Sequence, residues 1–353
     1  MKSSEKYLNK INDLAKKIKR NIKLMEVCGT HTQVIAQYGI KNVLPSNIKL
    51  VSGPGCPVCV TAKSDIDNVV AMALSGIPIF AYGDIIRVRG NGFSLAEARE
   101  MGASVREVYG AEEIFKLNKK TVFFGIGFET TAPMTASIIK RGAMVYSAHK
   151  AFIPAMKALL QSGEIKIDGL ISPGHVAAIV GADVFKDFKT ENNKYIPQVI
   201  AGFEIEDVFK AIILLLKQIA DGRAETENAY TRVVLPEGNI KALKLIDEVF
   251  EVEDSEWRGL GVIPNSGFKL RKEFEDRDAK IIYGDIITQI DADVNTDKHR
   301  HGCLCGSVIK GLSEPQNCSL FGKFCTPENP QGPCMVSVEG SCCVAYKNKT
   351  EKQ

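Results

Sequence analysis

The chain has 353 residues, of which 45% are hydrophobic, and its 45 basic and 42 acidic residues leave a net charge of +3. This length and composition are ordinary for a globular protein of two or three domains and argue against disorder. The charge is spread without a sustained basic block, and a single Trp offers little base-stacking surface, so nucleic-acid binding is not indicated.

The N-terminal segment predicts an amphipathic helix rather than a signal peptide, because it lacks a continuous apolar core and a small-residue cleavage site. Apolar residues recur there at helical spacing: Leu8, Ile11, Leu14, Ala15 and Ile18. The longest apolar run, "AIILLL" at 211–216, is far too short for a membrane span. We therefore expect a cytoplasmic protein.

Short β-rich runs alternate with helical stretches over the first two thirds of the chain. We expect strands at 22–27, 48–52, 77–82, 103–109, 121–127, 143–148, 168–172 and 196–202. The intervals are long enough for crossover helices, which predicts an α/β fold with two similar parallel-sheet α/β domains around a cleft. We place the first domain at 1–120, with "KLNKK" at its end, and the second at 121–222.

The remainder, residues 223–353, is expected to form a third, Cys-rich domain. After an amphipathic helix at 239–250 it becomes rich in Gly, Pro, Asn and Cys. Too little apolar periodicity is left for a self-sufficient core, so an internal staple should hold this segment together.

Ten cysteines in a chain expected to be cytoplasmic favour metal binding or thiol chemistry over structural disulfides. Cys28, Cys56 and Cys59 lie in the first sixth of the chain, the next 243 residues have none, and seven lie between Cys303 and Cys343. Two separate sites are implied.

Polar motifs follow six of the expected strands: "CGTHT", "GPGCPVC", "GDIIR", "FETTAP", "HK" and "PGH", in chain order. In open α/β sheets, ligands bind beyond the carboxyl ends of the strands. We therefore expect these segments to converge on one cleft between the two α/β domains.

In "CGTHT", Cys28 ends a strand and His31 stands close to the start of a helix. Backbone N–H groups and the helix dipole should lower the pKa of the Cys28 thiol and favour a thiolate that acts as nucleophile or metal ligand. The alternative is a buried structural cysteine beside a histidine that only packs.

In "GPGCPVC", glycines and prolines restrict the backbone around Cys56 and Cys59, at the start of the expected helix "TAKSDIDNVVAMAL". Redox-active C-x-x-C pairs share this setting. The alternative is half of a zinc site, with Cys28 and His31 as the second ligand pair. Pro57 and the strand–turn–helix setting favour redox chemistry.

Four further polar residues at strand ends are candidate anchors for a ligand: Asp84, Glu129, His149 and His175. Each alone could be a helix cap or a satisfied loop residue, and their shared placement is what suggests a site. "FFGIGFET" lacks the third glycine of a dinucleotide fingerprint and no P-loop occurs, so nucleotide binding is not indicated.

The C-terminal cysteines carry the strongest signal. Cys303, Cys318, Cys325 and Cys342 are separated by 14, 6 and 16 residues, with Cys305, Cys334 and Cys343 beside them. Four thiolates suit a [4Fe–4S] cluster or a structural zinc, and the spacing alone does not choose between them.

Together, these motifs resemble one family over nearly the whole chain, the hydrogenase maturation protein HypD. The resemblance is carried by "MEVCGTHT", "GPGCPVC", "GFETTAP", "PGHV", "EGN", "WRGLG", "CLCG", "LFGKFCTP" and "GPCMVSVEG". It implies two related α/β domains and a third domain with a [4Fe–4S] cluster on Cys303, Cys318, Cys325 and Cys342. The adjacent Cys343 is a second candidate for the last ligand.

The resemblance also implies a function. HypD-like proteins associate with the small partner HypC and form the scaffold on which the Fe(CN)2CO unit of [NiFe]-hydrogenases is assembled, with cyanide delivered by HypE. Cys28 would then be an iron ligand, and Cys56 and Cys59 would relay reducing equivalents. The remaining candidates for contacts to cyanide or for proton delivery are His31, Asp84, Glu129, His149 and His175.

Such a protein would be a metallocofactor assembly scaffold with redox activity rather than a conventional turnover enzyme. The main alternative is an iron–sulfur thiol/disulfide oxidoreductase that acts on partner proteins through Cys56 and Cys59. A third possibility is a zinc-stapled interaction module without redox function.

Overall fold

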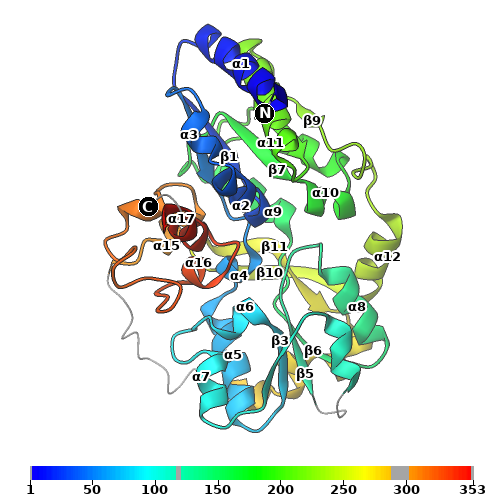
Figure 1. Ribbon diagram of the computed structural model, residues 1–353. Helices are drawn as coiled ribbons and strands as arrows, with labels where there is room; N and C mark the ends of the chain where they lie inside the picture. The colour runs from blue at the N-terminus through cyan, green and yellow to red at the C-terminus, as the bar shows by residue number, and fades with distance from the viewer. Residues whose placement is uncertain (1, 117–120, 288–301, 351–353) are drawn as a thin grey trace.

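The computed structural model describes residues 2–116, 121–287 and 302–350. Two parallel sheets lie one above the other along the long axis of the molecule, and a Cys-rich lobe lies against their side (Figure 1). The α/β fold with two parallel sheets and a separate Cys-rich region confirms the fold class expected from the sequence.

The upper sheet has five strands in the order β2-β1-β7-β8-β9, and all of its neighbours are parallel. Its strands are β1 (Ile22–Glu26), β2 (Ile48–Ser52), β7 (Gly169–Pro173), β8 (Gln198–Ala201) and β9 (Thr226–Asn228). The helices around it are α1 (Lys2–Lys17), α2 (Gly29–Gln37), α3 (Ile40–Val43), α10 (Gly174–Val180) and α11 (Ile205–Ala220).

The lower sheet has four parallel strands in the order β4-β3-β5-β6. Its strands are β3 (Ile79–Tyr82), β4 (Val105–Val108), β5 (Val122–Gly125) and β6 (Met144–Ser147). The helical segments between β2 and β7 are α4 (Pro57–Val60), α5 (Lys63–Leu74), α6 (Gly83–Ile86), α7 (Leu95–Glu100), η1 (Ala111–Lys116), α8 (Ala132–Lys140) and α9 (Phe152–Gln161).

All eight expected strands are present, but their expected grouping by chain order is wrong. The first two strands pair with β7 and β8, and β3 lies between β4 and β5. The proposed boundary between 1–120 and 121–222 therefore falls within the lower sheet, at residues 117–120, which lie outside the described residues. Strands buried on both faces have similar apolar sequences, so their sequences do not reveal which neighbour each one pairs with.

The upper sheet is covered on one face by α1 and α11, whose apolar faces explain their positions. Ile11 of α1, Leu24 of β1, Ile171 of β7 and Leu216 of α11 belong to one buried cluster, and each is 0% exposed. The amphipathic helix expected from the first twenty residues is thus confirmed as a cover for the sheet.

The expected third domain, 223–353, is divided into two parts. Its first part packs on the lower sheet and consists of α12 (Ile240–Val249), β10 (Phe250–Trp257), β11 (Gly261–Leu270), η3 (Lys272–Arg277) and α13 (Ala279–Ile282). The 3₁₀ turn η2 (Asp183–Asp187) lies earlier in the chain, between α10 and β8. The hairpin β10–β11 was not expected from the sequence. It is antiparallel, packs against α9, and reaches the end of α4, where Arg258 N donates to Val60 O at 2.9 Å.

The second part is the Cys-rich lobe, which we define as residues 302–350. Its helical segments are α15 (Cys305–Ile309), η4 (Pro315–Asn317), α16 (Pro333–Val336) and α17 (Ser341–Thr350). α17 packs against α2 and α16 packs against α4, so the lobe lies directly on the two segments that carry Cys28 and the Cys56/Cys59 pair. Within the described ranges, no helix has the length and apolar character needed to cross a membrane.

A buried ion pair fastens the hairpin to the lower sheet. Lys150, directly after β6, is 2% exposed, and its Nζ lies 3.4 Å from Asp65 Oδ2 and donates to Ser255 Oγ at 2.7 Å. The Tyr146 hydroxyl donates to Asp65 Oδ1 at 3.1 Å. Burial lowers the pKa of Lys150, and the charge of Asp65 opposes this, so the pair ties α5, β6 and β10 together.

Asp65→Asn should destabilise the protein by about 3 kcal/mol, because it leaves the Lys150 ammonium buried without its counter-charge. Urea unfolding under anaerobic conditions would measure the loss. The double variant Asp65→Asn/Lys150→Met, which removes both charges, should regain part of it. An unfolding midpoint of Asp65→Asn equal to that of the parent would show that the pair does not hold the hairpin in place.

Candidate functional site

Cys28 lies where the upper sheet meets both the Cys-rich lobe and the segment with Cys56 and Cys59. It is the N-cap of α2, directly after β1, and it is partly buried. Its backbone N–H donates to Glu26 Oε2 at 3.2 Å, and Glu26 itself is 2% exposed. The carboxyl group of Glu26 is thus in direct contact with the backbone of Cys28.

Two glycines allow three chain segments to meet at Cys28. A Cβ atom on Gly55 would overlap the backbone N of Cys28, and the N–H of Gly29 donates to Gly55 O at 3.2 Å. A Cβ atom on Gly29 would overlap the side chain of Glu339 from the Cys-rich lobe. Because only glycine permits these approaches, "CGTH" and "GPGC" both require it at these positions.

Cys56 and Cys59 form a disulfide. They flank Pro57 at the start of α4, a short helix of their own, and not at the start of α5 as the sequence suggested. Cys56 is 7% exposed and Cys59 is 1% exposed, so the disulfide is buried beside the backbone of Cys28. The two sulfurs are thus close enough for the reversible bond that a redox-active C-x-x-C pair forms.

The expected lowering of the Cys28 pKa is wrong. The backbone N–H groups of Thr30 and His31 do lower it, as a helix start should. Burial is the largest influence, however, and with the negative charges of Glu339 and Glu26 it raises the pKa of the Cys28 thiol to about 12. Without a bound cation, Cys28 is therefore a neutral thiol near neutral pH.

His31 and His175 are joined by an aromatic stack. His31 is buried, and the centroid of its ring lies 4.7 Å from that of Phe203. The ring of exposed His175 also stacks on Phe203, with 3.7 Å between the ring centroids. His31 Nε2 bonds Gly202 O at 2.9 Å, and burial lowers the pKa of His31 to about 4. Nδ1 of His31 has no hydrogen-bond partner within the described part of the chain. The stack extends from the helix of Cys28 to the surface.

Asp84, in α6, positions the lobe rather than a ligand. Its Oδ2 accepts hydrogen bonds from Ser337 Oγ and Val338 N, both at 3.0 Å. Glu339 follows directly and contacts Gly29, so Asp84 places the carboxylate that faces Cys28. The sequence suggested that Asp84 anchors a ligand directly. Instead, Asp84 bonds the residues that precede Glu339 and so acts on the site through Glu339.

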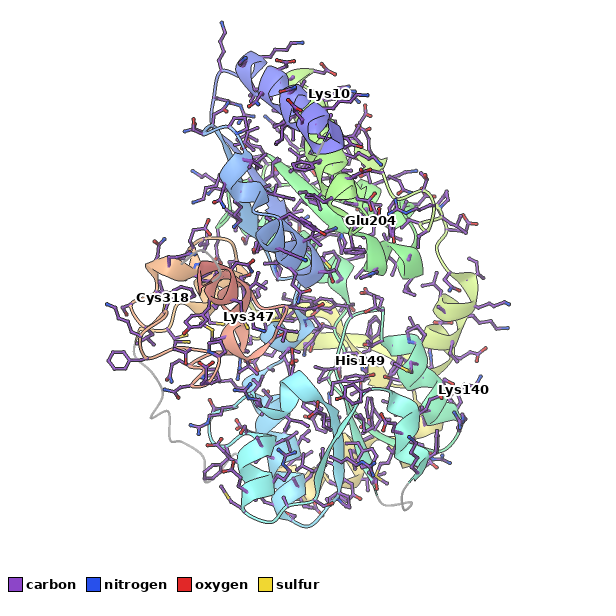
Figure 2. All side chains as sticks on the ribbon, in the orientation of Figure 1. Lys10, Lys140, His149, Glu204, Cys318 and Lys347 are labelled. Carbon is purple, nitrogen blue, oxygen red and sulfur yellow. A yellow bond between two sulfur atoms is a disulfide. The ribbon has the colours of Figure 1, made fainter. Side chains whose placement is uncertain are left out.

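Glu129 and His149 are buried parts of the lower sheet and its surroundings. Glu129 Oε1 accepts from Phe152 N at 2.9 Å at the start of α9, and burial raises its pKa to about 7. His149 bonds Thr135 and Ser147, both at 3.2 Å, and burial lowers its pKa to about 3. Figure 2 places His149 beside α8, away from the lobe that carries Cys318. His149 therefore has the contacts of a satisfied core histidine.

The Cys-rich lobe encloses a small cavity whose wall is formed by cysteines and apolar side chains. Its lining residues are Cys303, Leu304, Cys305, Val308, Cys318, Phe321, Cys325, Gly332, Cys334, Met335 and Cys342. Cys343 is not among them, whereas all four cysteines of the expected ligand set are. A Cβ atom on Gly332 would approach Cys303 Sγ to 3.2 Å, so glycine leaves room for the sulfurs.

These residues fit a [4Fe–4S] cluster in chemistry. Thiolates are its usual ligands, the wall carries no charged side chain, and Gln331 N donates to Cys325 Sγ at 3.3 Å. In residues 2–116, 121–287 and 302–350, no three His, Cys, Asp or Glu side chains converge closely enough to hold a single metal ion. A cluster is larger than a single ion, so its thiolates stand farther apart.

Cys305 and Cys334 form a close thiol pair in the wall of this cavity. Their sulfurs lie 3.0 Å apart, and both cysteines are free. Cys334 belongs to α16, which packs on α4, the helix that carries Cys59. Two cysteine pairs thus lie in adjoining segments of one buried cluster.

Three of the residues that shape the site were not found by sequence reasoning. Glu26 carried a signal, because it is a carboxylate in an otherwise apolar strand directly before "CGTH". Glu339 and Phe203 carried none, since each reaches Cys28 or His31 from a distant part of the chain.

The fold and the site define a class of α/β protein with two parallel sheets. In this class, a free thiol, a buried disulfide and a cysteine-lined cavity lie where the Cys-rich lobe packs on α2 and α4. A family model described as "HypD: Hydrogenase formation hypA family" matches residues 2–349. The chain therefore belongs to the HypD family, and it is a hydrogenase maturation factor.

Individual relatives agree. A protein of Methanocaldococcus jannaschii named for hydrogenase expression and formation is 44% identical, with 97% of this chain and 96% of the relative covered. The hydrogenase maturation factor HypD of Azotobacter vinelandii is 39% identical over 95% of this chain and 91% of its own length. That of Escherichia coli is 36% identical over 100% of this chain and 96% of its own.

Glu339→Gln should lower the pKa of the Cys28 thiol, because it removes one negative charge while keeping the contact to Thr30. At mildly alkaline pH a larger fraction of Cys28 would then be thiolate, and its alkylation by iodoacetamide should be several-fold faster. Mass spectrometry of the Cys28 peptide would measure this rate. Glu237→Gln, an exposed change elsewhere, should leave it unaltered. Equal rates in parent and Glu339→Gln would show that Glu339 does not act on the thiol.

Proposed function

We propose that this maturation factor is the scaffold on which the Fe(CN)2CO unit is assembled, together with a HypC-like small partner and with cyanide delivered by a HypE-like donor. The observation that supports this best is the meeting of three segments at Cys28. The thiol ends β1, the disulfide segment contacts its backbone, and Glu339 of the Cys-rich lobe lies over Gly29.

In this proposal Cys28 is the iron ligand contributed by this chain. A soft thiolate suits iron that carries strong-field ligands, and partial burial slows the loss of cyanide and the access of oxidants. Because the free thiol has a raised pKa, binding of iron must release its proton. Glu26 and Glu339 are the carboxylates close enough to influence that proton.

The Cys-rich lobe would hold a resident [4Fe–4S] cluster on Cys303, Cys318, Cys325 and Cys342. The cavity wall supports Cys342 over Cys343 as the fourth ligand, since only Cys342 lines it. When bound, such a cluster supplies one-electron redox chemistry. The lobe packs its Val308, Met335 and Val336 into the main core, so the cluster would also fasten this segment in place.

The two cysteine pairs would relay reducing equivalents within the chain. Reduction of the Cys56–Cys59 disulfide requires two electrons and two protons and yields two thiols. Transfer of the disulfide bond to Cys305 and Cys334 would balance this reaction, because two thiols are oxidised there as two are formed at Cys56 and Cys59. The packing of α16 on α4 supports this route.

Burial of the disulfide weighs against the alternative of a thiol/disulfide oxidoreductase for partner proteins. Cys56 and Cys59 are at most 7% exposed. A partner's thiolate therefore cannot attack the disulfide unless the Cys-rich lobe separates from α4. We also propose a cytoplasmic location, in keeping with a thiol-based site, and an interaction with neither nucleic acid nor membrane.

Cys28→Ser tests the scaffold proposal directly. A neutral hydroxyl is a poor ligand for soft iron, so the variant should copurify with its HypC-like partner without the infrared bands of bound CN and CO. It should fold and retain stability within about 1 kcal/mol of the parent, because the change is nearly isosteric. Cys343→Ser, a matched change at a cysteine outside both sites, should keep the bands. Bands of parental intensity in Cys28→Ser would remove Cys28 from the iron site.

Cys318→Ala tests the cluster. The variant should lose nearly all of its iron and acid-labile sulfide, and its melting temperature should fall by about 5 °C, because binding of a metal group to a segment without its own core contributes to folding. Iron analysis, visible absorption and calorimetry under anaerobic conditions would measure both effects. Cys343→Ala should keep its iron. Full iron content in Cys318→Ala would contradict the assigned ligand set.

A further inference from the structure

A cationic surface lies directly outside the cysteine-lined cavity. Cys303 and Cys305 line that cavity and also line a larger pocket of about 520 Å³ between the lobe and the lower domain. The other three cysteines of the ligand set are at most 9% exposed. Cys303, the one member of the ligand set that is not buried, therefore lies in the wall shared by the two hollows.

The loop at the rim of the larger pocket carries an exposed aromatic side chain. Phe324 is 68% exposed, and its carbonyl oxygen accepts from Asn329 Nδ2 at 3.1 Å and from Gln331 Nε2 at 3.4 Å. Asn329 and Gln331 line the pocket, so Phe324 stands at its edge. A phenyl ring exposed to this degree, next to a cysteine of the ligand set, has no role in the packing of the lobe.

The charges around this rim are mostly positive. Arg89 and Glu97 form an ion pair and cancel. The other charged residues of the pocket wall and the adjoining loop are four cations and two carboxylates: Lys63, Arg87, Arg258, Lys323, Glu100 and Glu328. Of the cations, Arg87 and Lys323 are exposed, whereas Lys63 and Arg258 are partly buried. Arg87 is exposed, and its guanidinium donates to the neutral carbonyl of Pro327 at 2.6 Å, next to the Phe324 loop. Glu328, in the same loop, interacts electrostatically with Arg87 and offsets part of its charge, whereas exposed Lys323 adds a second cation.

We propose that Arg87, Lys323 and Phe324 form a docking surface for a small, acidic one-electron carrier protein. Electron-carrier encounters use small interfaces, and an apolar anchor ringed by cations complements an acidic partner and speeds its association. The inference rests on the proposed function, because the carrier would serve the redox chemistry of the lobe.

The carrier closes the electron balance of the site. Each docked carrier is oxidised by one electron, so two encounters supply the two electrons that convert the Cys56–Cys59 disulfide, with two protons from solvent, into two thiols. Exchange between the two cysteine pairs reduces one disulfide while it forms another, so it supplies no net electrons. No described part of the chain is otherwise a net source of electrons. The electrons must therefore come from an external donor, and the proposed surface would bring such a donor next to the lobe.

The test uses the full chain, purified anaerobically, and an acidic plant-type [2Fe–2S] ferredoxin as the probe. Calorimetric titration should give binding in about 0.01 M salt, where the Debye length is about 30 Å, and should lose it in about 1 M salt, where it is about 3 Å. Arg87→Glu and Lys323→Glu should each weaken binding about tenfold, and Phe324→Ala by a similar factor.

Lys241→Glu is the matched control, because Lys241 is exposed on α12, outside this surface, and the variant has the same net charge as the other two reversals. It should change the dissociation constant less than about twofold. A second readout is the rate of thiol formation at Cys56 and Cys59. This rate should fall in Arg87→Glu with reduced ferredoxin, whereas it should not fall with the methyl viologen radical cation, because a cationic donor is not attracted by Arg87.

Several results would overturn the inference: salt-independent ferredoxin binding, equal weakening by Lys241→Glu and Lys323→Glu, or equal binding of basic cytochrome c. Displacement of ferredoxin by inorganic phosphate, but not by chloride of equal ionic strength, would instead make the pocket a site for small anions. A chain without iron would overturn the proposed function together with this inference. A chain with iron that does not bind ferredoxin would overturn this inference alone.

Discussion

The close approach of three backbones at Cys28 is the constraint on which the rest of the site depends. Gly55 brings the disulfide segment against the backbone of Cys28, and Gly29 admits Glu339 from the Cys-rich lobe. A side chain at either glycine would separate the segments, because it would meet the backbone of Cys28 or the side chain of the partly buried Glu339. Sheet order follows the same constraint: β1 and β2 lie side by side in the upper sheet, so the loops after them, with Cys28 and Cys56, emerge next to each other.

Electrostatics at this meeting point favours a thiol that stays protonated until a cation arrives. The helix start at α2 stabilises a thiolate, but burial and the carboxylates of Glu26 and Glu339 oppose it more strongly. The same two carboxylates would attract a cation. In the proposed function, a cysteine that becomes a thiolate only on binding metal would accept iron without reacting with every disulfide or oxidant that it meets.

The Cys-rich lobe has no separate hydrophobic core among the described residues, because its buried side chains belong to the core of the α/β part. Met335, Val336 and Cys334 belong to the same buried cluster as Cys59 and Val60, and the hairpin tip at Arg258 bonds to the end of α4. Any change in the cysteines of the lobe is therefore felt at the disulfide, since packed interiors transmit small displacements. This arrangement gives the two cysteine pairs a fixed relation to Cys28, and it leaves Phe324, at the edge of the pocket, exposed to solvent.

The sequence by itself determined most of the local elements. All eight expected strands and the helices at 2–17 and 240–249 follow from apolar periodicity, and the spacing of thiols singled out Cys28, Cys56, Cys59 and the C-terminal cysteines as candidates; both are properties of neighbouring residues. The hairpin β10–β11 was missed. Tertiary structure alone decided which strands pair, because parallel strands with similar buried sequences do not identify their partners. It also decided the raised pKa of Cys28 and the role of Asp84, since Glu339 and Ser337 approach them from the far end of the chain. A pKa and a hydrogen-bond partner depend on the residues that are close in space. A sequence pattern shows only the residues that are close along the chain.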